Sequence, residues 1–206
     1  MKSTPTDDLR LPLMELFYSL QGEGFHTGEA AVFLRIGGCD VGCRWCDVKE
    51  SWDADLHPLT PVQEILDEIR AFPSASVVVT GGEPLKHNLD PLCEGLREAA
   101  CRTYLETSGS EPLSGSWDWI CLSPKKGAPP LTDICLLADE LKVIIENEND
   151  FEWAETQAER VSKACLLYLQ PEWSKHKEIT PGIVDYIGSN PRWKLSLQVH
   201  KYIGIP

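Results

Sequence analysis

Short apolar runs that indicate strands alternate along the chain with amphipathic segments that predict helices. The run AAVFLRIGG (30–38) is β-branched, apolar and stopped by glycines, which is typical of a buried strand. The segment LTPVQEILDEIRAF (59–72) spaces its apolar residues three and four apart, which predicts a helix with Thr60 as N-cap and Pro61 as its first residue. The predicted buried face of this helix consists of Val62, Ile65, Leu66 and Ile69.

The same alternation continues through the rest of the sequence. Further strands are predicted over 76–80, 103–107, 119–123, 141–145, 165–170 and 194–198, and further helices over 90–100, 150–163 and 180–189. Short apolar strands that alternate with helices favour a parallel sheet covered on its outer side by helices. About seven parallel strands are too few for a full eight-fold barrel, so we predict an α/β fold of the partial, open βα (TIM-like) barrel type.

Polar and glycine-rich segments follow these predicted strands. GGCDVGCRWCD (37–47) follows the first strand and GGEP (81–84) the second, and TSG, SPKK, QPE and QVHK follow later ones. All of them lie at the carboxyl ends of strands, which is the rim where βα architectures build their active sites. We therefore expect these segments to meet at one site.

Composition narrows the class of protein. The 206 residues include 42% hydrophobic residues and no evident linker, which predicts one domain over 1–206. The first residues, MKSTPTDDLR, do not resemble a signal peptide, and no apolar run approaches the roughly 18 residues of a membrane span, so we expect a cytoplasmic protein with no membrane partner. A net charge of −13 argues against a nucleic-acid partner and favours a small-molecule substrate.

Three cysteines, Cys39, Cys43 and Cys46, lie within eight residues. In the cytoplasm this spacing indicates metal binding or chemistry rather than disulfides. A structural zinc site needs four ligands, and His26 or Asp47 could supply the fourth. An electron-transfer cluster is another interpretation, and a [4Fe–4S] cluster held by three thiolates, with one iron open to a reacting ligand, is the third. The other cysteines are expected to be small buried hydrophobes: Cys93, Cys101, Cys121, Cys135 and Cys165.

The C-x3-C-x2-C spacing, with Trp45 before the last cysteine, resembles the radical S-adenosylmethionine superfamily. The resemblance implies that S-adenosylmethionine chelates the open iron and that the reduced cluster cleaves it to a 5′-deoxyadenosyl radical, which abstracts a hydrogen atom. TGGEP (80–84) resembles the companion motif that contacts the methionyl amino group. Gly81 and Gly82 are expected there because backbone without a Cβ can approach the ligand closely.

Within that superfamily, several further segments resemble the 7-carboxy-7-deazaguanine synthase family. They span nearly the whole chain: FYSLQGEG (17–24), FLRIGGC (33–39), ETSG (106–109), SPK (123–125), ELKV (140–143), LQPE (169–172) and LSLQVHKYIGIP (195–206). The resemblance implies contraction of 6-carboxy-5,6,7,8-tetrahydropterin to 7-carboxy-7-deazaguanine with loss of ammonia, on the way to queuosine-type nucleosides. It also implies that S-adenosylmethionine is regenerated, that the protein is a homodimer, and that a low-potential donor such as flavodoxin or ferredoxin reduces the cluster.

The same resemblance implies two sets of site residues. The set expected beside the cluster and S-adenosylmethionine is Trp45, Cys46, Asp47, Gly82, Ser123, Pro124, Lys125 and Gln170. The set expected to bind the pterin is Leu20, Gln21, Gly22, Arg35, Thr80 and the terminal carboxylate of Pro206. The guanidinium of Arg35 suits a substrate carboxylate because it donates two parallel hydrogen bonds. Plainer interpretations stay open: Arg35 as an ion pair at a strand end, Lys125 as a loop charge, and His200 as a structural hydrogen-bonding residue.

One position departs from the family. The residue two after the last cysteine is usually Thr or Ser, whose hydroxyl helps to hold a Mg²⁺ that also binds substrate, whereas this chain has Val48. Valine has no side-chain oxygen to offer a hard cation. We therefore expect Mg²⁺ to stimulate this protein weakly or not at all.

Two alternative functions remain at this point. A glycyl-radical enzyme activase would share the three cysteines and the glycine-rich companion motif, but it acts on a protein and leaves LQGEG and QVHKYIGIP unexplained. A zinc- or cluster-stabilised binding module would use the cysteines without catalysis. Iron content and S-adenosylmethionine cleavage separate the module from both enzymes.

Overall fold

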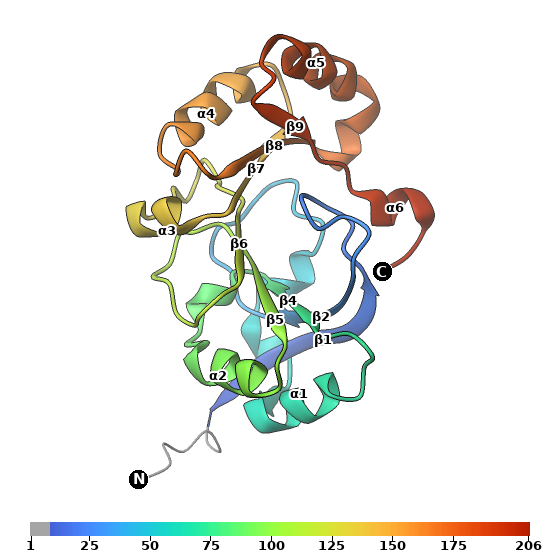
Figure 1. The fold of residues 1–206 in the computed structure, drawn as a ribbon, viewed down its shortest axis with the longest axis vertical. Helices are drawn as coiled ribbons and strands as arrows, with labels where there is room; N and C mark the ends of the chain where they lie inside the picture. The colour runs from blue at the N-terminus through green and yellow to red at the C-terminus, as the bar shows by residue number, and fades with distance from the viewer. Residues whose placement is uncertain (1–8) are drawn as a thin grey trace.

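The computed structural model describes residues 9–206, and its centre is one nine-stranded sheet that curls into an open arc (Figure 1). The strand order is β3-β1-β2-β4-β5-β6-β7-β8-β9. The strands are β1 (Arg10–Leu20), β2 (Ala30–Ile36), β3 (Leu59–Pro61), β4 (Ser76–Gly81), β5 (Arg102–Thr107), β6 (Trp119–Leu122), β7 (Glu140–Ile145), β8 (Leu166–Pro171) and β9 (Trp193–Leu195).

All strands from β2 through β4 to β9 pair in parallel, and this confirms the predicted partial, open βα barrel. β1 and β3 extend one edge of the sheet through antiparallel pairings. Helices α1, α2, α4 and α5 lie along the outside of the arc, whereas α6 lies at its open side, near the C-terminus (Figure 1). The α-helices are α1 (Val62–Ile69), α2 (Asp90–Glu98), α3 (Thr132–Leu137), α4 (Asn149–Ala158), α5 (His176–Ser189) and α6 (Val199–Ile203), and short 3-10 turns cover Lys49–Ser51, Ala54–Leu56, Pro84–Lys86 and Trp173–Lys175.

The hydrophobic core lies between the sheet and the outer helices. Leu34, Val79, Leu105 and Ile120 are register partners on four neighbouring strands, and all four are buried. The predicted apolar face of α1 packs into the same core. Because side chains alternate between the two faces of a strand, the residue after each core position points to the inner face of the arc.

The start of α1 differs from the sequence prediction. Thr60 is not an N-cap and Pro61 is not the first helical residue; the helix begins at Val62, and Leu59–Pro61 forms β3. Thr60 takes an extended conformation because its register partner across the antiparallel pair is Leu11 of β1, and its hydroxyl donates to the Pro58 carbonyl instead. Tertiary strand pairing therefore outweighs the local capping signal.

Other boundaries shift by a few residues. Helix α5 begins at His176 and contains Pro181, so the expected start at residue 180 is too late. The second and third predicted helices end early, at Glu98 and Ala158. Strands β1 and β3 and helices α3 and α6 were not predicted. No helix within residues 9–206 is long and apolar enough to cross a lipid bilayer.

Candidate functional site

The carboxyl ends of the parallel strands surround a cavity of about 220 Å³. Its lining comes from the segments after β1, β2, β4, β5, β6, β8 and β9, together with residues of the strands themselves. The sequence analysis predicted that the polar and glycine-rich segments meet at this rim, and in the structure residues from them line one cavity.

All three clustered cysteines, Cys39, Cys43 and Cys46, line this cavity. Their loop is fixed by backbone hydrogen bonds, including one of 2.9 Å from the Cys39 N–H to the Trp52 carbonyl and one of 3.0 Å from the Cys46 N–H to the Cys43 carbonyl. Burial raises the pKa of the Cys39 and Cys43 thiols, with smaller contributions from Glu83 at Cys39 and from the neighbouring cysteines at both. Bound metal would reverse this, since the ligand is the thiolate and binding releases protons.

The two side chains considered as a fourth zinc ligand are both engaged elsewhere. His26 does not line the cavity; its ring stacks on Tyr104 and its Nδ1 lies 3.0 Å from Glu29 Oε1. Asp47 does line the cavity, but its Oδ2 accepts hydrogen bonds from Lys201 and from another side chain. Among residues 9–206 no three His, Cys, Asp or Glu side chains form a group suited to a single metal ion.

Gly81, the last residue of β4, and Gly82, which follows it, are required by contact with the end of β2 and the segment after it. A Cβ on Gly82 would lie 2.5 Å from the Gly38 carbonyl oxygen and 2.7 Å from the Cβ of Cys39, and a Cβ on Gly81 would lie 2.1 Å from the Ile36 oxygen. The expectation that these glycines make room for a ligand is therefore incomplete. They first let the loop after β4 pack on the loop after β2, which sets the position of the cysteines.

Glu83, next in the same motif, is buried and shapes its loop. Its carboxylate accepts hydrogen bonds from the Thr107 hydroxyl (2.6 Å), the Ser108 N–H (2.8 Å) and the Leu85 N–H (3.2 Å). These bonds join the loops after β4 and β5, so the glycine-rich segment is held from both sides.

Seven of the eight residues expected beside S-adenosylmethionine line this cavity: Trp45, Cys46, Asp47, Gly82, Ser123, Lys125 and Gln170. Pro124 does not; it lines another cavity, to which residues 41–45 of the cysteine loop also contribute. Lys125 is more than a solvated loop charge, because its Nζ donates to Ser123 Oγ (2.7 Å) and lies 5.6 Å from the centroid of the Trp45 ring.

A second cavity, of about 350 Å³, adjoins the first. Its lining includes all six residues expected to bind the pterin: Leu20, Gln21, Gly22, Arg35, Thr80 and Pro206. The two cavities are neighbours because five residues line both, namely Glu23, Asp47, Thr80, Glu106 and Gln198.

Arg35 combines the two roles considered for it. Its Nε donates to Glu15 Oε2 across the β1–β2 pair at 3.0 Å, and its side chain, 19% exposed, also lines the second cavity. His200 also lines this cavity, and its second contact is packing on a loop. Its ring packs so closely on Gly22 that a Cβ there would lie 2.2 Å from Nδ1.

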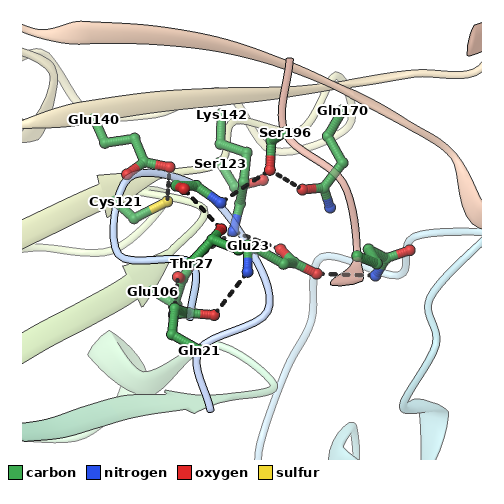
Figure 2. A network of polar contacts seen from close by, with 12 residues as sticks. Gln21, Glu23, Thr27, Glu106, Cys121, Ser123, Glu140, Lys142, Gln170 and Ser196 are labelled. Atoms are coloured by element: carbon green, nitrogen blue, oxygen red, sulfur yellow. Dashed lines mark hydrogen bonds and ion pairs between the residues drawn. The ribbon is translucent and has the colours of Figure 1, made fainter. Parts of the chain in front are cut away.

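A buried ion-pair group lies at the boundary of the two cavities. Lys142 Nζ lies 2.6 Å from Glu23 Oε2 and 2.9 Å from Glu106 Oε2 (Figure 2), and the Lys142 side chain is only 4% exposed. Burial opposes charge on Glu23, but Lys142 and its hydrogen bonds outweigh burial and lower the pKa of Glu23 to about 2. Burial also opposes charge on Lys142, but the surrounding acidic groups raise its pKa well above the usual value. Glu23 and Lys142 are therefore both charged at neutral pH.

Sequence reasoning did not single out Glu23, Glu106 or Lys142 as site residues. A signal was nevertheless present, since Glu106 and Lys142 are isolated charges inside the otherwise apolar strands TYLET and LKVII. A charge in a buried strand is rarely tolerated unless it is paired or functional.

The loop that carries Gln21, Gly22 and Glu23 is anchored to the sheet by a buried carboxyl. Glu140 Oε2 accepts from the Phe25 N–H at 3.0 Å, and burial raises the pKa of Glu140. Two further bonds come from the C-terminal part of the chain: the Gly24 N–H donates to Ser196 Oγ (2.9 Å), and the Val199 N–H donates to the Gly22 carbonyl (2.9 Å).

We expect Glu140→Gln to loosen this loop. The amide is neutral and a weaker acceptor than a carboxylate, so amide hydrogen exchange of residues 22–27 should rise by about 10-fold or more, measured by mass spectrometry. Exchange in β4 should be unchanged. Glu68→Gln, on the exposed face of α1, is the matched control and should alter neither region. Unchanged exchange of the loop in Glu140→Gln would contradict the anchoring role.

Comparison with known proteins agrees with this geometry. The family model described as the Radical SAM superfamily matches residues 34–128, which include the cysteine loop and the loop after β4. The 7-carboxy-7-deazaguanine synthase of Flavobacterium psychrophilum is 55% identical, over 95% of this chain and 93% of that protein. The enzyme of the same name from Synechocystis is 48% identical, over 94% of this chain and 93% of that protein.

A solved structure shows the same fold. The crystal structure of QueE from Escherichia coli superposes with a TM-score of 0.85 at 28% identity, covering 97% of this chain and 100% of that chain. The sequence matches extend over nearly the full length of both partners. The chain therefore belongs to the 7-carboxy-7-deazaguanine synthase family of radical S-adenosylmethionine enzymes.

Proposed function

We propose that this chain converts 6-carboxy-5,6,7,8-tetrahydropterin to 7-carboxy-7-deazaguanine with loss of ammonia, on the route to queuosine-type nucleosides. The observation that carries the proposal is the pair of adjoining cavities. One is lined by the three cysteine thiols, the other by the six residues expected to bind a pterin, and five residues are common to both. A glycyl-radical activase would need a groove for a protein substrate, whereas the second cavity has the size of a small molecule.

The donor set of the first cavity fits an iron–sulfur cluster. Cys39, Cys43 and Cys46 would hold a [4Fe–4S] cluster through thiolates, and Gly82, Ser123 and Gln170 would line the S-adenosylmethionine site. When bound, the reduced cluster and S-adenosylmethionine supply the radical chemistry that starts the reaction. The role of the protein is to hold S-adenosylmethionine and the pterin in place and to keep water out of the space between the cavities.

The residues of the second cavity suit a carboxylated pterin. Arg35 offers a cationic, fork-shaped donor for the carboxylate. Glu106 and Gln21 are linked by a 3.4 Å hydrogen bond and would accept and donate along the nitrogen-rich edge of the ring. Pro206, whose main-chain oxygen accepts from Ser19 Oγ at 3.1 Å, lines the same cavity and would add a further acceptor.

The proposal also covers the oligomeric state of the protein, its electron donor and its compartment. We infer a homodimer of single-domain chains, reduced by a flavodoxin or a ferredoxin, in the cytoplasm. All eight cysteines are free, which is consistent with a reducing compartment. The family resemblance supports the dimer and the electron donor.

The direct test is an anaerobic assay of reconstituted protein with dithionite, S-adenosylmethionine and 6-carboxytetrahydropterin, followed by mass spectrometry. We expect deazaguanine product in large excess over 5′-deoxyadenosine, because S-adenosylmethionine is regenerated. Deoxyadenosine without deazaguanine would reject the substrate and favour the activase. Colourless protein that carries zinc and forms neither compound would favour the binding module.

The three clustered cysteines should each be essential. Cys39→Ala, Cys43→Ala and Cys46→Ala should each lose cluster absorbance, iron and product formation while the circular dichroism spectrum stays native, because these residues lie on a loop at the rim of the barrel. The matched control is Cys101→Ala, a half-buried cysteine just after α2 that lines neither cavity; it should keep iron and activity. Turnover by any of the three rim variants would remove the cluster assignment.

A further inference from the structure

A divalent cation is the one component of the family's site that the residues of this chain do not fit. Val48 lines the second cavity at the position where the family usually has Thr or Ser, and its side chain has no oxygen. Mg²⁺ demands oxygen ligands and gives up its hydration water reluctantly, so the loss of one oxygen matters only if no other is free nearby. Whether another oxygen is free depends on the other side chains of the cavity.

Each carboxylate side chain that lines the second cavity is already paired with a lysine, and the main-chain oxygen of Pro206, which lines it as well, accepts a hydrogen bond from Ser19 Oγ. Asp47 Oδ2 lies 2.5 Å from Lys201 Nζ, and Glu23 and Glu106 share Lys142. Three carboxylates therefore face two ammonium groups within or beside the cavity. A cation placed there would have to displace a lysine from a short ion pair as well as find a ligand in place of the missing hydroxyl.

Lys201 places a positive charge in the same cavity as Val48. It comes from α6, its side chain is 20% exposed, and it lines the same cavity as Val48 and Pro206. Its Nζ donates to Asp47 Oδ2 and to Gln198 Oε1 (3.1 Å), and it lies 4.9 Å from the centroid of the Trp173 ring.

These contacts leave Lys201 with donor capacity. A lysine ammonium has three N–H donors, and the described contacts use two of them. The aromatic face of Trp173 adds attraction for the charge without using a donor. The third N–H is available to an acidic oxygen of a molecule bound in the cavity.

We propose that the Lys201 ammonium replaces the divalent cation in this chain. It balances the charge of Asp47 and donates its remaining N–H to an acidic oxygen of the substrate, in the cavity that Arg35 also lines. The proposal rests on the pterin function proposed above. Its consequence is that substrate binding and turnover are independent of Mg²⁺ and depend on Lys201.

The test measures binding as well as activity. Titration calorimetry follows 6-carboxypterin, a stable analogue with the same carboxylate, binding to the reconstituted enzyme with S-adenosylmethionine, in chelator or in Mg²⁺. Wild type should bind equally in both conditions. Lys201→Met should bind about 10-fold or more weakly in both, because it loses a charge-assisted hydrogen bond, and Lys201→Arg should recover most of the affinity.

A double variant asks whether the cation and the lysine are interchangeable. Val48→Thr combined with Lys201→Met restores the hydroxyl and frees Asp47, so Mg²⁺ should recover binding and turnover in this variant but not in Lys201→Met alone. Lys194→Met is the matched control. That lysine also lies over an aromatic ring, Tyr168, but lines neither cavity, so its removal should leave affinity unchanged.

The outcomes separate this inference from the proposed function. If wild type forms deazaguanine but Mg²⁺ raises its rate or affinity several-fold, the inference is wrong and the function stands. Equal affinity of Lys201→Met and wild type also overturns it. If wild type forms no deazaguanine in either condition, the function itself is wrong, and the calorimetry then reports only on a pterin site.

Discussion

The alternation of side chains along the parallel strands is the constraint on which the site depends. Leu34, Val79 and Leu105 face the outer helices and form one buried row across β2, β4 and β5. The next residue on each of these strands therefore faces inward. Those residues are Arg35, Thr80 and Glu106, and all three line the second cavity. The packing of the core thus sets the lining of the site, because a shift of one residue would exchange the two faces.

The same rule on β7 and β8 places Lys142 and Gln170 on the inner face beside the core residues Leu141 and Leu169. Lys142 lines the first cavity, where its pairing with Glu23 and Glu106 makes its buried charge tolerable. Buried ion pairs of this kind contribute little net stability, since desolvation offsets the attraction. Their value here is geometric: Glu23 belongs to the loop after β1, so Lys142 ties that loop to the sheet.

Most of the parallel strands and the cysteine loop could be predicted from sequence, because apolar runs and cysteine spacing are local signals. Apolar runs such as SVVVT and LLYLQ identify parallel strands directly, and the cysteine spacing identifies the cluster loop. Strands β1 and β3 were not predicted because their pairing is not local. Thr60 has the residue type of an N-cap, but pairing with β1 holds it in a strand. Lys142 carries a local signal as an isolated charge in an apolar strand, but its partner could not be predicted. Only the fold brings Glu23 within 2.6 Å of it, across 119 residues of sequence.

The central claim is that the two cavities form one reaction space, in which the radical formed beside the cysteines reaches a pterin held by Arg35 and its neighbours. The most direct measurement uses 6-carboxytetrahydropterin deuterated at its saturated ring carbons, with mass spectrometry of S-adenosylmethionine after turnover. The account predicts deuterium at the 5′ carbon of the recovered S-adenosylmethionine and in any 5′-deoxyadenosine released, because the 5′-deoxyadenosyl radical takes a hydrogen atom from the substrate at that carbon. Deoxyadenosine that forms at full rate without any deuterium would contradict it.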